Sequence, residues 1–418
     1  MTKRLILAFV FLSWHLVACS NEDSGISSGL PNKPSAEEDS PGTETISEEM
    51  RVKITGEDLY ISAKLDAKTD ILYWFKKCMF NELFTFYRVG TIDNNMPAPA
   101  TLPDASPTSL LNLAYSDNIG PFNITGYGWC GGNHPYLDEV TQTARNIGYR
   151  IYIDGKEIKT DLSTLTKEIK IEVINEIMNP SKADTSSGKT LLNEILCIET
   201  VNYSIYRNNI QVLVTHEFQN ESPVTVQMYY GMQSMFDKET HTLTANGKYV
   251  DWTVQKDVST FTKKEYPSFR RFIEKSANAY QSSYLFADGL GNHEEISDDD
   301  IIFIGNSSNK TYHKIIADRE YKKGDIIHWS GVYTWFKSPV SDDDDLLCYE
   351  GVIDNKKVLF IDCKKSVDRT IQLPVDYTKK SFTIIEKSKS ITITGNKVTA
   401  KGLKIVSDGS GSCVITFD

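Results

Sequence analysis

Apolar and polar residues alternate with a period of two along most of the chain after residue 50. Ile210, Val212, Val214, His216 and Phe218 occupy every second position of one segment, with polar residues at most positions between them. Successive side chains of an extended strand point to opposite faces, so this alternation predicts strands with one buried face. Residues 169–173, 224–230 and 391–393 repeat the pattern. The chain is therefore predicted to be mainly β.

Turn signals separate these segments. Residues 219–223 form a polar cluster that ends in Pro223, between the segments 210–218 and 224–230. Asp154-Gly155 follows another alternating segment and is a strong hairpin signal. We therefore expect one hairpin over residues 210–230 and a second around Asp154.

One segment, residues 268–277, has the spacing of a helix. Ser268 follows Pro267 and is a suitable N-cap. The apolar residues that follow at helical spacing are Phe269, Phe272, Ile273 and Ala277. Strands separated by turns, with helices this rare, predict a large antiparallel β-sandwich, supersandwich-like in size.

The N-terminus carries a secretion signal. Lys3 and Arg4 precede an apolar stretch over residues 5–17, and Leu16-Val17-Ala18-Cys19 follows. This segment resembles a bacterial lipobox. The resemblance implies cleavage before Cys19 and lipidation of Cys19, which would anchor the protein to a membrane without a spanning helix. An ordinary secretory signal with a chance cysteine is the alternative.

The next residues are rich in Ser, Glu, Asp, Pro and Gly, which predicts a flexible acidic tether. Ser20-Asn21-Glu22-Asp23 resembles the export signals of surface lipoproteins in gut-type Gram-negative bacteria. It implies an outer-membrane location at the cell surface, although a periplasm-facing protein stays open. The acidic run at 342–345 suggests a further boundary. The predicted parts are a signal peptide (1–18), a tether (19–50), a large β-sandwich domain (51–345) and a small C-terminal β domain (346–418).

Composition excludes several functions. The 418 residues carry a formal net charge of −11, which argues against nucleic acid as a partner. Six cysteines follow Cys19 without zinc spacing, and Cys348 with Cys363 is the favoured disulfide pair. The acidic runs 298–300 and 342–345 lack EF-hand spacing and fit solvated loops. No metal and no cofactor is therefore predicted.

The densest chemistry lies in residues 117–145, where five glycines surround aromatic and polar side chains. Glycine-rich loops let a ligand approach the backbone closely. Aromatic rings can stack on a sugar, and amide, imidazole and guanidinium groups can bind hydroxyls or a carboxylate. The predicted ligand-binding residues are Trp129, Asn133, Tyr136 and Arg145, with His134 as a catalytic candidate. A tightly packed loop in which His134 bonds the backbone is the alternative.

Other candidates lie on predicted strands. Tyr230 and His216 are catalytic candidates for moving a proton, and Tyr229 is a candidate ligand contact. His216 shares an apolar stripe, so a core histidine is the leading interpretation. Trp329 and Trp335 lie on one face of residues 328–336 and suit either an aromatic platform under a glycan or a packed core.

Residues 51–340 resemble, in architecture alone, the large β-sandwich domains of polysaccharide lyases and mutarotase-like folds. The resemblance implies a lipid-anchored surface protein that binds or processes a polysaccharide, as a lyase or glycoside hydrolase if it is an enzyme. A non-catalytic adhesin or structural surface lipoprotein is the alternative. An enzyme requires His134, Arg145, Tyr230 and a carboxylate to converge in one open cleft.

Overall fold

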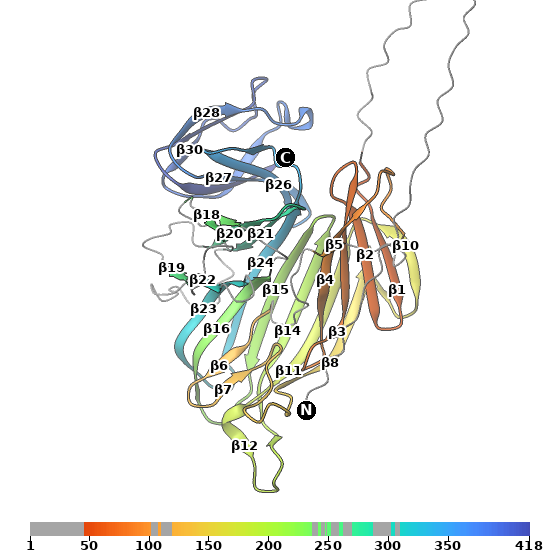
Figure 1. Cartoon of the computed structure of the whole chain (residues 1–418), viewed down its shortest axis with the longest axis vertical. Helices are drawn as coiled ribbons and strands as arrows, with labels where there is room; N and C mark the ends of the chain where they lie inside the picture. Colours follow the sequence, from red (N-terminus) through yellow and green to blue (C-terminus); the bar gives the residue numbers. More distant parts are fainter. Residues whose placement is uncertain are drawn as a thin grey trace, which may run out of the picture. The chain divides into compact units, whose positions relative to one another are not determined.

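The computed structural model describes residues 46–101, 108–109, 119–235, 241–243, 247, 249–251, 259–261, 270–286, 302–305 and 310–418. Cys19, the predicted signal peptide, nearly all of the predicted tether and the acidic run 298–300 lie outside these residues. Within them, regular structure is antiparallel β-sheet with two 3-10 turns, η2 (Pro180–Lys182) and η3 (Val375–Tyr377) (Figure 1). The mainly β, sandwich-type prediction is confirmed. None of the described segments is a helix of the length and hydropathy that would cross a bilayer.

The first sheet has the strand order β10-β1-β2-β3-β4-β5. It begins at Met50, the last residue of the predicted tether, which is fully buried. The strands are β1 (Met50–Thr55), β2 (Asp58–Lys64), β3 (Thr69–Cys78), β4 (Leu83–Asp93), β5 (Thr108–Ser109) and β10 (Leu162–Thr166).

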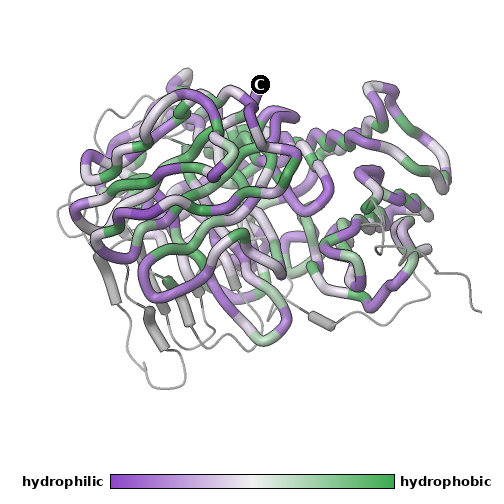
Figure 2. Tube along the Cα trace, turned by 90° about the horizontal axis from the view of Figure 1, so that it is seen from above, coloured by the Kyte–Doolittle hydropathy of each residue, from purple (hydrophilic) through white to green (hydrophobic). Residues whose placement is uncertain are grey.

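The central sheet is longer, with the order β18-β17-β20-β21-β24-β15-β14-β11-β8-β9. Its strand β15 buries the five alternating residues that the sequence singled out and leaves Leu213 and Glu217 exposed. Figure 2 shows hydrophilic and hydrophobic stretches following one another along the Cα trace. The strands are β8 (Ala144–Ile153), β9 (Lys156–Ile158), β11 (Ile169–Met178), β14 (Ile195–Tyr206), β15 (Asn209–Phe218), β17 (His241–Leu243), β18 (Tyr249–Asp251), β20 (Arg271–Lys275), β21 (Tyr280–Leu285) and β24 (Ile326–Phe336).

The third sheet has the order β19-β22-β23-β16-β6-β7, and β12 pairs with β13 in a separate ribbon. The strands are β6 (Phe122–Ile124), β7 (Gly128–Cys130), β12 (Ala183–Asp184), β13 (Leu191–Leu192), β16 (Val224–Met235), β19 (Ser259–Phe261), β22 (Ile302–Gly305) and β23 (Lys310–Tyr321).

Of the two expected hairpins, one is present. β8 pairs with β9 across Asp154-Gly155, as predicted. The hairpin over 210–230 is wrong, because β15 pairs with β14 and β24, whereas β16 pairs with β23 and β6. The turn at 219–223 therefore carries the chain from the central sheet to the third sheet.

Aromatic side chains join the first sheet to the central sheet. Tyr203 on β14 contacts Phe75 on β3 and Phe86 on β4, with ring centroids 5.4 and 6.2 Å apart. Phe86 also contacts Tyr333 on β24 at 5.5 Å. The third sheet joins the same core, where Tyr229 on β16 accepts a hydrogen bond from Trp329 Nε1 at 2.7 Å.

The predicted helix at 268–277 is wrong where the structure describes it. Residues Arg271–Lys275 form β20, which pairs with β17 and β21. Phe272 and Glu274 face the third sheet through His313 and Thr311. Ile273, on the opposite face, packs in a core shared with strands of the C-terminal region. Both faces of β20 are thus buried, which removes the alternation by which a strand is recognised.

The C-terminal strands form two sheets, β25-β26-β27-β32-β29 and β28-β31-β30, around a core of their own. Cys348 and Cys363 flank the β26–β27 hairpin but are buried free thiols, so the favoured disulfide is absent. The boundary near residue 345 stays a prediction. The strands are β25 (Ser341–Asp342), β26 (Leu346–Ile353), β27 (Lys356–Cys363), β28 (Val367–Ile371), β29 (Phe382–Lys387), β30 (Ile391–Ile393), β31 (Leu403–Ser407) and β32 (Gly411–Phe417).

The acidic run at 342–345 is not simply a solvated loop. Asp342 forms ion pairs with Lys275 on β20 at 2.9 Å and with Lys364 at 3.0 Å. Asp343 pairs with Arg369 on β28 at 2.7 Å. The run therefore ties the C-terminal sheets to the central sheet.

A buried carboxyl lies between the third and central sheets. Glu274 is fully buried and accepts hydrogen bonds from Ser234 and from Thr311, the latter at 3.1 Å. Gln281 donates to Ser234 and accepts from Trp335 Nε1, which completes a chain of polar contacts across the core. Burial raises the pKa of Glu274 from 4.5 to about 8, so that the carboxyl keeps its proton near neutral pH.

This raised pKa makes stability depend on pH. Between pH 4.5 and about 8 the folded chain holds a proton on Glu274 that the unfolded chain has lost, so the free energy of unfolding should fall as pH rises through that range. Glu274→Gln keeps the shape without the proton and should remove that slope. Urea unfolding at several pH values gives the free energy of unfolding of wild type and variant. Taking the difference between the two removes the contribution of other titrating groups such as His313. The exposed Glu217→Gln is the control, and a parallel pair of curves for wild type and Glu274→Gln would contradict the assignment.

Candidate functional site

The glycine-rich loop is held by one buried side chain on another strand connection. Asn81, between β3 and β4, donates from Nδ2 to the carbonyl oxygens of Gly132 and His134, at 2.8 and 3.2 Å. Its Oδ1 accepts from the backbone N–H groups of Thr143 and Ala144, at 3.0 and 3.3 Å. Thr143 in turn accepts from the N–H of Gly131. These hydrogen bonds hold the loop as one rigid unit. Asn81 was not among the residues predicted from the sequence.

Two predicted ligand contacts belong to this framework. Asn133 Oδ1 accepts a hydrogen bond from the backbone N–H of Phe80 at 2.7 Å. Tyr136 is half-buried, and its backbone pairs with Thr141. Asn133 thus fixes the loop to the β3–β4 connection.

Four rings form a ladder along the outer side of the third sheet. Trp129 on β7 stacks on His134 at 5.3 Å and on Tyr230 of β16 at 5.6 Å, both with 25° between planes. Tyr230 continues to Tyr312 on β23 at 4.8 Å. The structure thus brings together three of the candidates named from the sequence, His134, Trp129 and Tyr230. Each ring of the ladder packs against the next, so part of its surface is used in contacts within the ladder.

The remaining candidates on the central strands are core residues. His216 is fully buried, with Nε2 3.0 Å from Glu199 Oε2, and its ring meets Phe122 edge-on. Tyr229 is fully buried, and burial raises its pKa well above 10. A ligand cannot reach these groups in the folded chain, so the structure corrects the predictions that His216 moves a proton and that Tyr229 binds ligand.

Trp329 and Trp335 are also buried, at 1% and 0% exposure. Trp335 Nε1 donates to Gln281 Oε1, and its ring stacks on Tyr333. They build the packed core that the sequence left open as an alternative, and they form no platform on the surface. Alternate residues of a strand have the same spacing in a surface platform and in a core. Only the burial of the rings distinguishes the two.

Arg145 lies apart from the ladder. It projects from β8 with 60% of its side chain exposed and forms an ion pair with Glu176 on the neighbouring strand β11. Arg145 thus has its carboxylate partner on β11, a strand that carries none of the ladder residues.

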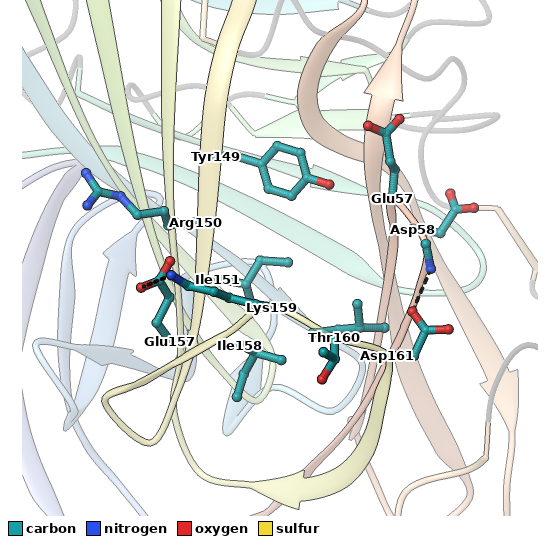
Figure 3. A pocket seen from close by; sticks show the side chains of 12 residues that line it. Glu57, Asp58, Tyr149, Arg150, Ile151, Glu157, Ile158, Lys159, Thr160 and Asp161 are labelled. Atoms are coloured by element: carbon teal, nitrogen blue, oxygen red, sulfur yellow. Dashed lines mark hydrogen bonds and ion pairs between the residues drawn. The ribbon is translucent and has the colours of Figure 1, made fainter.

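A pocket that the sequence did not indicate lies where the edges of the first and central sheets meet. It has a volume of about 270 Å³ and is formed by the β1–β2 turn, β8, β9 and the β9–β10 connection (Figure 3). Gly56, with φ +60°, lets the β1–β2 turn close, and its N–H donates to Asp161 Oδ1 at 3.0 Å. That bond ties the β1–β2 turn to the β9–β10 connection, next to the pairing of β1 with β10. The lining residues are Ile54, Gly56, Glu57, Asp58, Tyr149, Arg150, Ile151, Glu157, Ile158, Lys159, Thr160 and Asp161.

Polar groups dominate this pocket. Figure 3 shows the Tyr149 hydroxyl directed across it toward the β1–β2 turn. The Tyr149 ring is held by stacking on Phe84 with centroids 4.0 Å apart. Burial raises the pKa of Tyr149, and the carboxylates of Glu57 and Asp58 raise it further. The hydroxyl therefore stays protonated at neutral pH.

The pocket has an excess of negative charge. Four lining carboxylates, on Glu57, Asp58, Glu157 and Asp161, face two cations, on Arg150 and Lys159. A carboxylate only accepts hydrogen bonds, so this lining suits a ligand that is rich in donors and carries no negative charge. Within the described part of the chain, no three His, Cys, Asp or Glu side chains are grouped to hold a metal ion.

No signal in the sequence marks this pocket. Its residues come from 54–58, 149–151 and 157–161, and each stretch has the composition of an ordinary turn or edge strand. Only the meeting of two sheet edges brings them together.

No family model and no curated protein matches the chain. Among solved structures, the galactosidase domain of an alpha-galactosidase–sucrose kinase is similar at 10% identity and TM-score 0.37, over 68% of this chain and 41% of that one. A GH36 alpha-galactosidase from Geobacillus stearothermophilus gives 9% identity and TM-score 0.36, over 69% and 41%. A polysaccharide lyase gives 6% and 0.28, over 82% and 45%. These are weak similarities to glycan-active proteins, and the aligned region is less than half the length of each.

The Asn81 framework gives a direct prediction. Asn81→Ala leaves buried backbone groups of the loop without partners, so the free energy of unfolding should drop by about 2–4 kcal/mol. Urea unfolding at neutral pH measures this loss. Gln142→Ala is the control, because Gln142 also bonds a backbone carbonyl of the β3–β4 connection, that of Phe80, but is exposed. Equal losses in the two variants would contradict the role assigned to Asn81.

Proposed function

We propose that this protein is a lipid-anchored, extracytoplasmic polysaccharide-binding protein, and that the pocket between the two sheet edges holds one sugar unit. The pocket carries the proposal. Its volume lies near the lower end of small-molecule sites, about 300 Å³, which suits a single ring. Sugar hydroxyls carry no charge and can donate hydrogen bonds to the four carboxylates. They can also accept one from the tyrosine hydroxyl.

Binding is favoured over catalysis by how the polar groups are used. Asp161 accepts from the Gly56 N–H, and Asp58 accepts from Trp74 Nε1 at 2.9 Å. Carboxylates fixed by such bonds position a ligand, whereas a general acid or base needs a free proton-transfer position. Of the catalytic candidates from the sequence, His216 is buried, and His134 and Tyr230 pack against Trp129 in the ring ladder. A binding protein fits this pocket better than an enzyme, because binding does not require a free general acid or base.

The lipid anchor rests on the sequence Leu16-Val17-Ala18-Cys19. Growth with a clickable palmitate analogue should label the wild-type protein and leave Cys19→Ser unlabelled, because the thiol of residue 19 is the acceptor. Fractionation of the same cells should place the wild type with membranes. Label that persists in Cys19→Ser, or a wild type with an uncleaved N-terminus in the cytosol, would refute the anchor and leave the binding pocket untouched.

The pocket is tested with the soluble protein that lacks residues 1–45. We expect it to bind oligosaccharides on a glycan array, and the double variant Tyr149→Phe, Lys159→Met to lose about tenfold in affinity, because each change removes one hydrogen-bonding group and keeps the bulk. Titration calorimetry with the best array ligand measures the change.

The matched control is Tyr127→Phe with Lys182→Met. It makes the same chemical changes at exposed positions outside the pocket. Equal affinity in the pocket variant and the control would exclude the pocket as the site, and an array without any bound glycan would reject the proposed function.

A further inference from the structure

An aromatic surface adjoins the pocket on the outer side of the first sheet. Tyr60 on β2 stacks on Trp74 of β3 with centroids 5.2 Å apart, and Tyr87 on β4 meets Trp74 edge-on at 4.9 Å. All three rings are half-buried, in contrast to the covered Trp329 and Trp335. Together, Tyr60, Trp74 and Tyr87 form the ring face of the first sheet.

A β-bulge creates the ring face. The register between β3 and β4 shifts between Trp74 and Phe75, where Trp74 pairs with Arg88 and Phe75 pairs with Phe86. Tyr87 is the extra residue, so both Tyr87 and Arg88 lie opposite Trp74. Without the bulge, alternation would send one of these two side chains into the core. The local backbone thus places an additional ring and a cation on the outer side.

Cations accompany the rings. The Lys76 ammonium lies 4.6 Å from the Trp74 centroid and 4.1 Å from the Tyr87 centroid. Arg88 pairs with Trp74, and Lys53 on β1 pairs with Tyr60, so both share the outer side with the rings. Among the described residues, none of these three cations has a carboxylate within ion-pair distance. In a chain of net charge −11, three cations on one face, with no ion-pair partner among the described residues, are a local reversal of charge.

One hydrogen bond joins the ring face to the pocket. Asp58 lines the pocket and accepts from Trp74 Nε1. Asp58 also helps to raise the pKa of Tyr60, after burial, which places its carboxylate close to that ring as well. The rim of the pocket is therefore the beginning of the ring face, and a chain that leaves the pocket over Asp58 meets Trp74 next.

From this continuity we infer that the pocket and the ring face form one extended site, in which an uncharged sugar fills the pocket and an acidic sugar of the same chain lies on the ring face. The inference rests on the proposed function. The acidic lining of the pocket repels a uronate or sulfated unit, whereas Lys53, Lys76 and Arg88 attract one. The rings supply an apolar surface for the C–H face of the sugar. The preferred polymer therefore combines uncharged and acidic units.

Three tetrasaccharide probes distinguish the classes. Chitotetraose is uncharged, tetragalacturonate is acidic at every unit, and a hyaluronan tetrasaccharide alternates the two kinds. Calorimetry with the soluble protein should rank the alternating chain at least tenfold above the uncharged chain, and the fully acidic chain last. The preference for the alternating chain should shrink as salt rises, since it depends on ion pairs at the surface.

Variants of the ring face locate the effect. Lys76→Met with Arg88→Met should lower affinity for the alternating chain about tenfold and leave chitotetraose unchanged, whereas the exposed Lys356→Met should change neither. Trp74→Leu should weaken both tetrasaccharides by a larger factor than N-acetylglucosamine alone, because it removes the ring surface as well as the bond to Asp58. Trp74→Phe should restore the part of the loss that comes from the ring. Circular dichroism and urea unfolding of each variant exclude misfolding as the cause.

The outcomes separate this inference from the proposed function. If chitotetraose binds as well as the alternating chain, or if Lys76→Met with Arg88→Met has no effect, the ring face is not part of the site, although the pocket proposal stands. If the pocket variant Tyr149→Phe, Lys159→Met also leaves binding intact, both fall. Binding to anionic phospholipid vesicles that depends on Lys76 and Arg88, without any glycan preference, would identify a membrane-facing surface and overturn the inference.

Discussion

The packing of aromatic rings between the first and central sheets is the constraint on which the rest of the structure depends. Tyr203, Phe75 and Phe86 meet in mutual contact at the centre of the layer, and Tyr333 extends that contact to β24. With these rings interlocked, the first sheet can neither slide nor rotate over the central sheet without opening the core. The edges β10–β1 and β8–β9 are thereby held at a fixed separation, and the pocket is the space between them.

The sequence was a good guide to secondary structure where one face of a strand is exposed. β15 and β11 alternate because water reaches one side, and Asp154-Gly155 turns the chain within one sheet. Two predictions were wrong. The helix at 268–277 was predicted where β20 is covered on both faces, and the hairpin over 210–230 was predicted where the turn at 219–223 leads to a different sheet. Local pattern records the exposure of a strand but not the identity of its partner, because pairing is decided by residues far away in the chain.

The candidate site was predicted less well, for the same reason. The loop around Trp129 and His134 was visible as a cluster of glycine and aromatic residues, and its rings do meet Tyr230. The pocket was invisible because it combines three short segments, each with the composition of an ordinary turn or edge strand. His216 shows the opposite case, since its place in an apolar stripe already favoured the core, where it contacts Glu199. Composition can mark a dense loop, but it carries no information on where two edges converge.

The position of a bound sugar tests both proposals at once. The most direct measurement is a crystal structure of the soluble protein with its best oligosaccharide ligand. We expect density for one sugar ring between Tyr149 and Asp161, with the next unit passing Asp58 toward Trp74. Density against the ladder of Trp129 and Tyr230, with no ligand beside Tyr149, would contradict this prediction and make the candidates within residues 117–145 the better site.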